Sequence, residues 1–371
     1  MHRLDSNTES ERQGRPRWHR PARWIACAAA LAMCMSIRPT RADPAPDAPP
    51  APRVAQDTVQ VDARTEQTIR GALRYLAEKQ QPNGSFVADQ NHQAALSAYA
   101  LMAFMAAGEV PGEGEFGSAV KKGEDFLLDC CRPDGYIAAP TGENNMYGHG
   151  IATICLAEMY GESPNPALRP KLERAIKLIV SCQNAQGGWR YPPKIGDADI
   201  SVTVLQVVAL RAAKNAGLDI PQSTIDRAVA YVKSCQDRFD PRGFDYQPGT
   251  LQAGFARTAA AIYSLQVCGL YDDPMVAAGS EFLVEKRDLS MQYFTYGNFY
   301  AAPAEYMIGG KAWTDWYGWI HAELMDKVQT MGDTKYWNPF DPGTGVNTIY
   351  ATSVYTMILA MPLHYVPLYQ R

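Results

Sequence analysis

A motif that recurs about every 50 residues constrains this chain more than any other feature. Each copy runs from an apolar helix end through a polar turn to a glycine followed by an aromatic residue. The four copies occupy residues 75–86, 126–136, 179–189 and 231–244. Their anchoring glycines, Gly84, Gly135, Gly188 and Gly243, lie 51, 53 and 55 residues apart. A period of this length accommodates two helices with their loops, so we expect a repeat of helical hairpins.

The segments on the two sides of each turn differ in polarity. Segments after the turns are apolar and Ala-rich, as expected of helices covered on nearly all sides: Gln93–Ala107, His149–Tyr160, Ser201–Ala213 and Arg257–Cys268. Segments before the turns, such as Leu172–Cys182 and Ile225–Cys235, alternate charged and apolar residues at helical spacing. This alternation predicts an all-α fold, a single α/α toroid of about six hairpins with an inner and an outer ring. An open solenoid is the alternative.

The repeat weakens after Ser280, although three later segments still have helical character: Met291–Gly309, Trp313–Gln329 and Asn347–Leu359. They supply the remaining hairpins of the expected toroid, which we assign to residues 65–360. Pro362 and Pro367 predict that the tail, residues 361–371, is extended and straps across the barrel. The aromatic stripe of Trp313, Trp316, Tyr317 and Trp319 is interpreted as core, with an apolar pocket wall as the alternative.

The N-terminal segment has the features of an export signal. Five arginines between positions 12 and 23 precede the apolar run Trp24–Ile37, and Ala42 ends a small-residue cleavage site. The run is shorter than the roughly 20 residues of a spanning helix. We therefore expect residues 1–42 to be removed, residues 43–64 to form a Pro/Ala-rich linker, and the mature protein to be periplasmic or extracellular, without a spanning segment.

Charge and cysteine usage exclude several functional classes. The net charge of −4 provides no basic face of the size that nucleic acids require. Six cysteines remain after signal removal, and Cys131, Cys182 and Cys235 recur at matching repeat positions. Such cysteines are interpreted as small buried residues at helix ends, with disulfides as the alternative. No cofactor and no metal centre are predicted.

Three segments carry a family resemblance. The turn Gln183–Trp189 resembles the Gln-Trp repeat motif of squalene-hopene and oxidosqualene cyclases. Met146–Thr153, Gly187–Tyr191 and Asp197–Thr203 look like secreted bacterial squalene-cyclase-like repeat proteins of unassigned activity. The resemblance, which covers about residues 65–360, implies the terpenoid cyclase and protein prenyltransferase toroid. It also implies that Trp189 braces the fold and takes no part in chemistry.

The same resemblance suggests a general acid. Squalene-hopene cyclases carry an Asp-x-Asp-Asp run whose middle Asp protonates an alkene, and the matching run here is Asp197-Ala198-Asp199-Ile200. Asp199 then takes the place of the acid, whereas Ile200 replaces the last carboxylate. Because neighbouring groups must keep such an acid protonated, the change at Ile200 puts cyclase chemistry in doubt.

Candidate site residues follow from the expected topology. Inner helices of a toroid start around one mouth, so residues at these starts converge. Asp199, Asp197 and His149 are the catalytic candidates, and His92, Tyr147, Arg257, Tyr296 and Tyr350 are the substrate-binding candidates. His149 and Asp199 are expected to line one cavity. For the acidic and histidine residues the alternative is helix capping, and for Arg257 it is a structural ion pair.

Three functions remain open. The leading hypothesis is a hydrophobic, isoprenoid-like ligand in a central cavity, with terpene cyclase or isomerase activity through Asp199. The alternatives are a carbohydrate-active hydrolase or lyase, and a non-catalytic scaffold that binds a protein partner. An apolar cavity favours the first, an open polar groove with facing carboxylates the second, and a filled centre the third.

Overall fold

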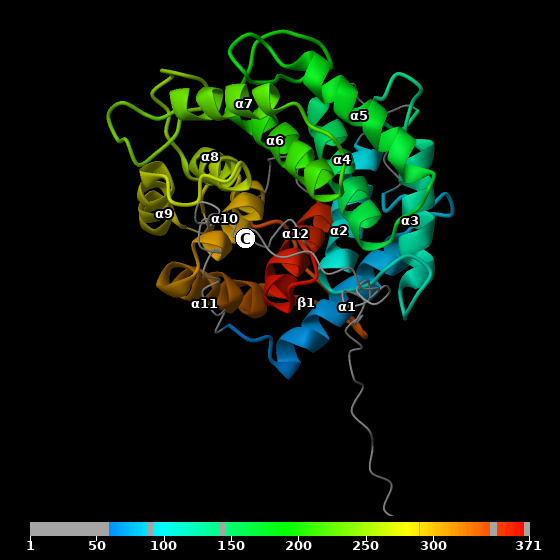
Figure 1. Ribbon diagram of the computed structural model, residues 1–371. Coiled ribbons are helices and arrows are strands. Elements are labelled where there is room, and N and C mark those ends of the chain that lie inside the picture. The colour runs from blue at the N-terminus through cyan, green and yellow to red at the C-terminus, as the bar shows by residue number, and fades with distance from the viewer. Residues whose placement is uncertain (1–58, 88–91, 141–144, 289, 342–346, 367–371) are drawn as a thin grey trace, which may run out of the picture. The chain divides into compact units, whose positions relative to one another are not determined.

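The described residues of the computed structural model are 59–87, 92–140, 145–288, 290–341 and 347–366, and they belong to one compact unit. They form twelve α-helices that alternate between two rings (Figure 1). The inner ring consists of α2 (Gln93–Ala106), α4 (Met146–Glu162), α6 (Ile200–Asn215), α8 (Phe255–Val267), α10 (Phe294–Ile308) and α12 (Thr348–Ala360). The outer ring consists of α1 (Ala63–Lys79), α3 (Gly117–Asp129), α5 (Leu168–Cys182), α7 (Gln222–Ser234), α9 (Pro274–Lys286) and α11 (Gly310–Lys327).

Contacts between inner helices close the ring. Each inner helix packs against the next from α2 to α12, and α12 packs back against α2. Five of the outer helices, α1, α3, α5, α7 and α9, each pack against two inner helices. The expected all-α toroid of six hairpins is therefore confirmed, and an open solenoid is excluded because a solenoid has no contact between its first and last repeats.

Burial explains why the two rings differ in sequence. All residues but one are buried in α12 and in α8, and α2 is almost as fully covered. Outer helices bury one stripe only; α7, for example, buries Thr224, Ala228, Tyr231 and Val232. A helix enclosed by neighbours on all sides has no polar face, whereas a peripheral helix keeps one for water.

The repeated turns join neighbouring hairpins. Gly84, Gly135 and Gly187 have φ between 90° and 101°, and a Cβ at any of them would overlap a backbone oxygen of the next outer helix. Only glycine tolerates both conditions. The Gln183 amide donates to the Gly187 carbonyl of its own turn and to the Thr224 carbonyl of α7, each at 2.9 Å. Gln80 does the same between its turn and α3.

The aromatic residue of each turn lies in the core. Trp189 is fully buried, its ring nitrogen donates to the Ile179 carbonyl of α5 at 2.7 Å, and its backbone N–H donates to Thr203 of α6. Trp337 makes the equivalent bonds to Leu324 and Thr352. It belongs to a further copy of the motif that the sequence hides, because the nearest preceding glycine, Gly332, lies five residues away.

The C-terminal part differs from expectation in two places. A short antiparallel hairpin, β1 (Gln329–Met331) and β2 (Thr334–Tyr336), replaces the turn before α12 and packs on α1. In the tail, Met361–Leu363 form a 3-10 helix, so this stretch is not extended. Tyr365 then lies against Gly108 beyond the end of α2, so the tail crosses that end of the ring as far as residue 366.

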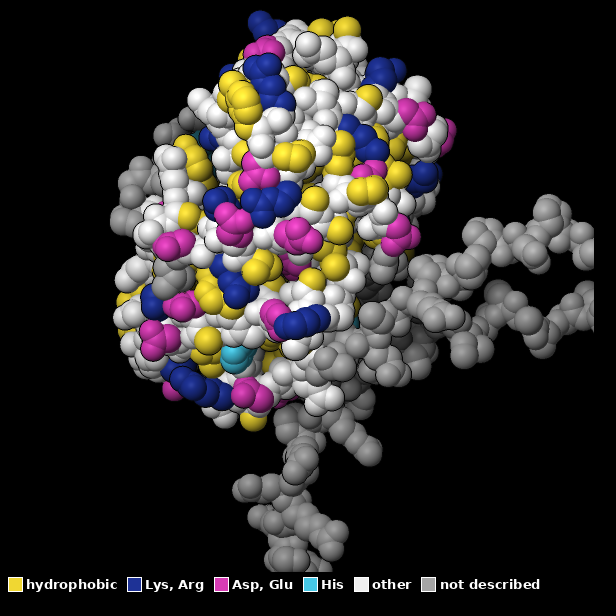
Figure 2. All heavy atoms as spheres, turned by 90° about the vertical axis from the view of Figure 1, so that its left-hand side faces the viewer, with side chains coloured by type: hydrophobic (Ala, Val, Ile, Leu, Met, Phe, Trp, Pro, Cys, Tyr) yellow, Lys and Arg dark blue, Asp and Glu magenta, His cyan; other side chains and the backbone are white. Residues whose placement is uncertain are grey.

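Cysteines and surface charges agree with the sequence expectations that can be checked. The six described cysteines are free thiols; Cys182 and Cys235 are buried at helix ends, whereas Cys131 is only half-buried. Charges of both signs are interspersed over the face drawn in Figure 2. None of the described helices is long and apolar enough to cross a membrane. The predicted signal and most of the linker lie outside the described residues.

Candidate functional site

The eight candidate residues all lie at the starts of inner helices. Two are N-caps: His92 of α2 and Asp199 of α6. Asp197 precedes α6 by three residues, and the others lie within the first four residues of their helices: Tyr147 and His149 of α4, Arg257 of α8, Tyr296 of α10 and Tyr350 of α12. We call this end of the toroid the mouth.

Tyrosine side chains fill the centre below the mouth. The rings of Tyr147 and Tyr296 are in edge contact at 6.4 Å between centroids, although α4 and α10 are opposite members of the inner ring. Tyr99 of α2 contacts Tyr350 at 4.6 Å and Phe299 of α10 at 5.1 Å. Aromatic rings therefore occupy the axis of the toroid. All of them belong to tyrosines except Phe299, which packs against Tyr99.

Two small pockets are lined by described residues. One, between the starts of α2 and α4, has a volume of about 20 Å³ and is lined by His92, Tyr136 and Asn145 among others. Another lies under Tyr306 and the tail and holds even less. Neither approaches the roughly 300 Å³ at which pockets for small organic ligands begin.

A charged cluster lies on the α6 side of the mouth. The Arg190 guanidinium is 3.1 Å from an Asp199 oxygen and 3.9 Å from an Asp197 oxygen. It also lies over the rings of Tyr191 and Tyr246, at 4.8 and 5.5 Å from their centroids. The two tyrosine hydroxyls meet at 2.5 Å. Tyr191 in turn contacts Tyr147, which connects the cluster to the tyrosine-filled centre.

The two aspartates of this cluster have different environments. Asp199 is fully buried, and its Oδ1 accepts the Val202 N–H at 2.8 Å, which caps α6. Burial raises the pKa of Asp199, although the Val202 N–H and Arg190 act in the opposite direction. Asp197 has 65% of its side chain exposed. A hydrogen bond from the Gln247 amide, together with the Ala198 N–H, lowers the pKa of Asp197. Asp197 is therefore an accessible carboxylate, and Asp199 is an enclosed one.

His149 does not join this cluster. Its Nδ1 accepts the Ile137 N–H at 3.2 Å, its ring stacks on Tyr136, and its surroundings include the Ala175 carbonyl of α5. Ser97, Thr203, Thr258 and Thr352 accept the corresponding turn N–H in the other repeats. Burial lowers the pKa of His149 to about 4. These contacts direct the side chain to the turn and the outer ring, and neither His149 nor Asp199 lines the two small pockets described above.

Arg257 has no acidic partner in the described part of the chain. It is half-buried, its Nη1 donates to the Gln252 carbonyl, and its guanidinium lies 5.9 Å from the Tyr246 ring centroid. The structural ion pair that we considered from the sequence is therefore not seen among these residues. On the opposite side, His92 is exposed and adopts φ 65° without capping α2 through its side chain.

Sequence reasoning missed four members of the cluster: Arg190, Tyr191, Tyr246 and Gln247. All four lie in the loops between a repeated turn motif and the next inner helix, where no periodicity marks them. One feature of the sequence could have indicated Arg190: it directly follows Trp189, so the repeated turn fixes its position at the mouth.

Comparison with solved structures places the fold but not the chemistry. A sugar epimerase from a ruminal bacterium aligns with 81% of this chain and 98% of its own, with a TM-score of 0.60 at 10% identity. A glycoside hydrolase family 76 mannosidase from Bacteroides thetaiotaomicron gives the same coverage and TM-score at 12% identity. The type II terpene cyclase MstE from Scytonema aligns with 82% of this chain and 99% of its own, with a TM-score of 0.52 at 13% identity.

At such low sequence identity, the structural similarity shows a shared α/α toroid and does not show a shared activity. Neither the protein-family models nor the curated proteins yield a match to this chain. The toroid is thus common to enzymes that act on sugars and to terpene cyclases.

Proposed function

We propose that this protein binds a saccharide at the mouth of the toroid. One observation carries the proposal: Tyr191 and Tyr246 enclose the Arg190 guanidinium beside the accessible Asp197 carboxylate. Aromatic ring faces next to fixed, planar hydrogen-bonding groups suit a sugar, which has apolar C–H faces and hydroxyls around its edge. The Gln247 amide, half-buried and bound to Asp197, adds to this set.

The packing of the centre also supports a ligand held at the surface of the mouth. An isoprenoid of useful length needs a deep apolar cavity, whereas here Tyr147 and Tyr296 meet across the axis. A saccharide needs only an open polar surface with aromatic platforms. The filled centre equally fits a protein-binding scaffold, but such a scaffold gives no reason for the Arg190 cluster.

Binding is favoured over glycoside hydrolysis by the state of the two aspartates. Glycosidases generally use two carboxyl groups that both reach the scissile bond. In this cluster Asp197 is accessible, but Asp199 is enclosed, caps α6 and faces Arg190. We assign Asp199 the role of a positioning residue that orients the Arg190 guanidinium.

An acid-catalysed reaction on an isoprenoid is the second candidate, favoured by Asp199 at the position of the cyclase acid. It predicts that Asp199→Asn abolishes turnover of a polyprenyl substrate while binding persists, because the amide lacks a transferable proton. Mass spectrometry of lipids that copurify with the native protein separates the candidates. A stoichiometric polyprenyl lipid favours the cyclase-like function, and its absence together with saccharide binding favours ours.

The direct test is affinity electrophoresis and calorimetry with a panel of neutral and anionic polysaccharides. We expect Tyr246→Ala to weaken binding at least tenfold, since it removes one ring of the pair and the hydroxyl partner of Tyr191. The matched control is Tyr271→Ala, because Tyr271 follows the C-terminal end of α8 at the opposite end of the toroid. No binding by the wild type to any member of the panel contradicts the proposal.

A further inference from the structure

The exposed apolar side chains of this protein are concentrated at one end. Among the described residues, the large hydrophobic side chains that are exposed are Tyr191, Ile195, Phe239, Leu251, Val284, Tyr293 and Met331. Six lie between an outer helix and the next inner helix, and Val284 lies in the last turn of α9. All seven are therefore at the mouth end, where a ligand surface is expected to concentrate them.

Two of the seven also have strained backbones. Leu251 and Tyr293 have φ of 55° and 62°, and their side chains are 41% and 42% exposed. A bulky residue in the left-handed region costs roughly 1–2 kcal/mol, and these two side chains are only partly packed against the protein. Strain of this kind is maintained where a side chain has a function. The two residues precede α8 and α10, which are neighbours in the inner ring.

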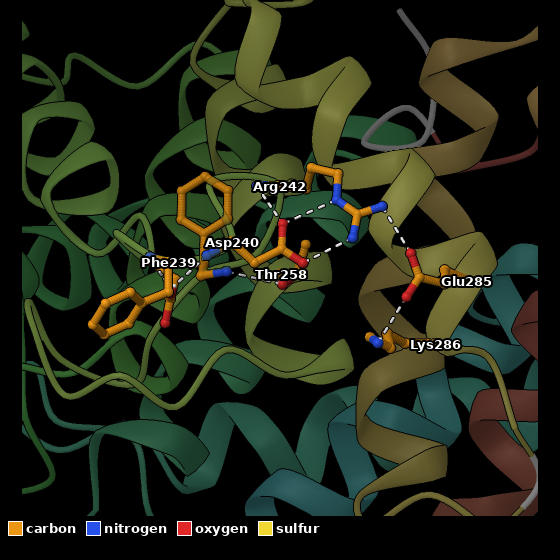
Figure 3. Close-up of polar contacts among 8 residues, drawn as sticks. Phe239, Asp240, Arg242, Thr258, Glu285 and Lys286 are labelled. Carbon is orange, nitrogen blue, oxygen red and sulfur yellow. Dashed lines mark hydrogen bonds and ion pairs between the residues drawn. The ribbon is translucent and has the colours of Figure 1, made fainter.

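The loop that carries Leu251 is held rigidly. The buried Asp245 carboxylate accepts the Leu251 N–H at 3.0 Å and the Gln252 N–H at 2.8 Å. Earlier in the same connection, the Arg242 guanidinium bonds both oxygens of Asp240 and reaches Glu285 of α9 at 2.7 Å (Figure 3). The buried Asp245 carboxylate therefore fixes the backbone at Leu251, while the Arg242 contacts hold the start of the same connection against α9.

Arg257 lies in the first turn of α8, six residues after Leu251. Only one of its donors is engaged by the Gln252 carbonyl, and no carboxylate of the described residues lies within 4 Å. Arg190 differs, because Asp199 already balances its charge at 3.1 Å. A half-buried guanidinium beside an aromatic ring and without a counterion is suited to a planar anionic group on a ligand.

We propose that the α8–α10 side of the mouth is a subsite for an anionic sugar unit, with Arg257 binding its carboxylate or sulfate group and with Leu251 and Tyr293 against its apolar faces. This inference rests on the saccharide-binding function proposed above and specifies its ligand class. Tyr246 connects the two halves of the site, because its ring contacts both Arg190 and Arg257.

The test compares a polyuronate and a sulfated galactan with a neutral glucan, by calorimetry on the full mature chain. We expect Arg257→Gln to weaken binding of the preferred anionic polymer at least tenfold and to weaken any binding of the neutral glucan much less. Arg257→Lys should retain part of the affinity for either anionic polymer, with a larger loss for the carboxylate, which guanidinium binds in a bidentate manner. The polymer that binds more tightly identifies the anionic group.

Arg211→Gln is the matched control, since Arg211 lies near the C-terminal end of α6, away from the mouth. Wild-type affinity for the anionic polymer should also fall between 50 mM and 500 mM NaCl, which needs no variant. Equal binding of neutral and anionic polymers, unaffected by Arg257→Gln, overturns the subsite and leaves the saccharide function intact. Loss of binding to every polymer in the wild type overturns both. Should Arg257→Gln fail to fold, the salt dependence and Arg257→Lys still decide the matter.

Discussion

The hydroxyl of Tyr296 on α10 donates to the backbone carbonyl of Ser201 on α6 at 3.1 Å. These two helices are not neighbours, since α8 lies between them in the inner ring. The bond therefore ties the ring across its interior, at the same level where Tyr147 and Tyr296 meet. A central ligand cavity and this bond cannot occupy the same space.

Removing this hydroxyl tests whether the closed centre contributes to stability. We expect Tyr296→Phe to lower the free energy of unfolding by about 1–2 kcal/mol, because a buried carbonyl loses its cross-ring donor while the ring packing is kept. Thermal and urea denaturation measure the change. Tyr271→Phe serves as the control, and an equal loss in that variant contradicts a specific role for the cross-ring bond.

Trp189 should brace the fold and have no chemical role. Trp189→Ala is expected to cost roughly 3–5 kcal/mol of unfolding free energy, because it empties a fully buried site and breaks the bond to Ile179. Calorimetric melting gives the measurement. An unchanged melting temperature combined with altered polysaccharide binding would reverse the assignment.

His149 should behave as a structural residue that makes the protein sensitive to acid. Its pKa is lowered to about 4 in the fold, so the unfolded chain binds the proton first as the pH falls. Its contribution to stability is therefore present above about pH 6.5 and is lost as the pH falls toward 4. His149→Thr places the hydroxyl of the other repeats at this position and should flatten the pH dependence. The measurement is the free energy of urea unfolding at pH 4.5, 5.5 and 7. If this free energy depends on pH in the variant as it does in the wild type, the assignment is contradicted.

Glu305 should act in the opposite direction. Burial raises its pKa to about 7, although Ser280 donates to its Oε2 at 2.8 Å. Between about pH 4.5 and 7 the folded state holds a proton that the unfolded state has lost, so this group makes unfolding free energy fall as pH rises. We expect Glu305→Gln to narrow the difference in stability between pH 5 and pH 8. A difference as large as that of the wild type rules out Glu305 as its source.

Leu251 should show a conflict between stability and binding. Leu251→Gly relieves the left-handed strain at φ 55° and adds disorder to the unfolded chain, with a net gain of about 0.5–1 kcal/mol. The same change removes an apolar contact and should weaken binding of the anionic polymer severalfold. Chemical denaturation and calorimetry provide the two readouts, and a gain in both contradicts a ligand contact at Leu251.

The sequence predicted at which helix starts the candidate residues lie, but it did not predict which way their side chains point. The period of the Gly-aromatic turns places Tyr147 and His149 at the start of one inner helix. Two residues along a helix differ by about 200° in direction, so Tyr147 faces the axis while His149 faces the outer ring. Periodicity assigned both to an inner helix without saying which element each would meet.

The loops were the other limit. Arg190 lies in the connection before α6, and Tyr246 lies in the connection before α8. The two residues form a cluster only because the fold brings these connections together. No local pattern encodes that pairing. Trp337 was hidden for a related reason: the β1–β2 hairpin moves the turn glycine, Gly332, to five residues before the aromatic residue, so the Gly-aromatic marker is absent.

The contact between α12 and α2 has a consequence for biogenesis. Until the sixth hairpin is present, one apolar flank of α2 and one of α10 lack a covering neighbour, so a chain truncated before α12 exposes two apolar helix surfaces at once. Native structure therefore arrives late, after nearly the whole toroid has been delivered. Because α2 and α12 are in contact, a circular permutant can join the two natural termini and begin at another surface loop. Such a permutant retains every contact between inner helices. The polypeptide has two ends, but the ring of inner-helix contacts has none.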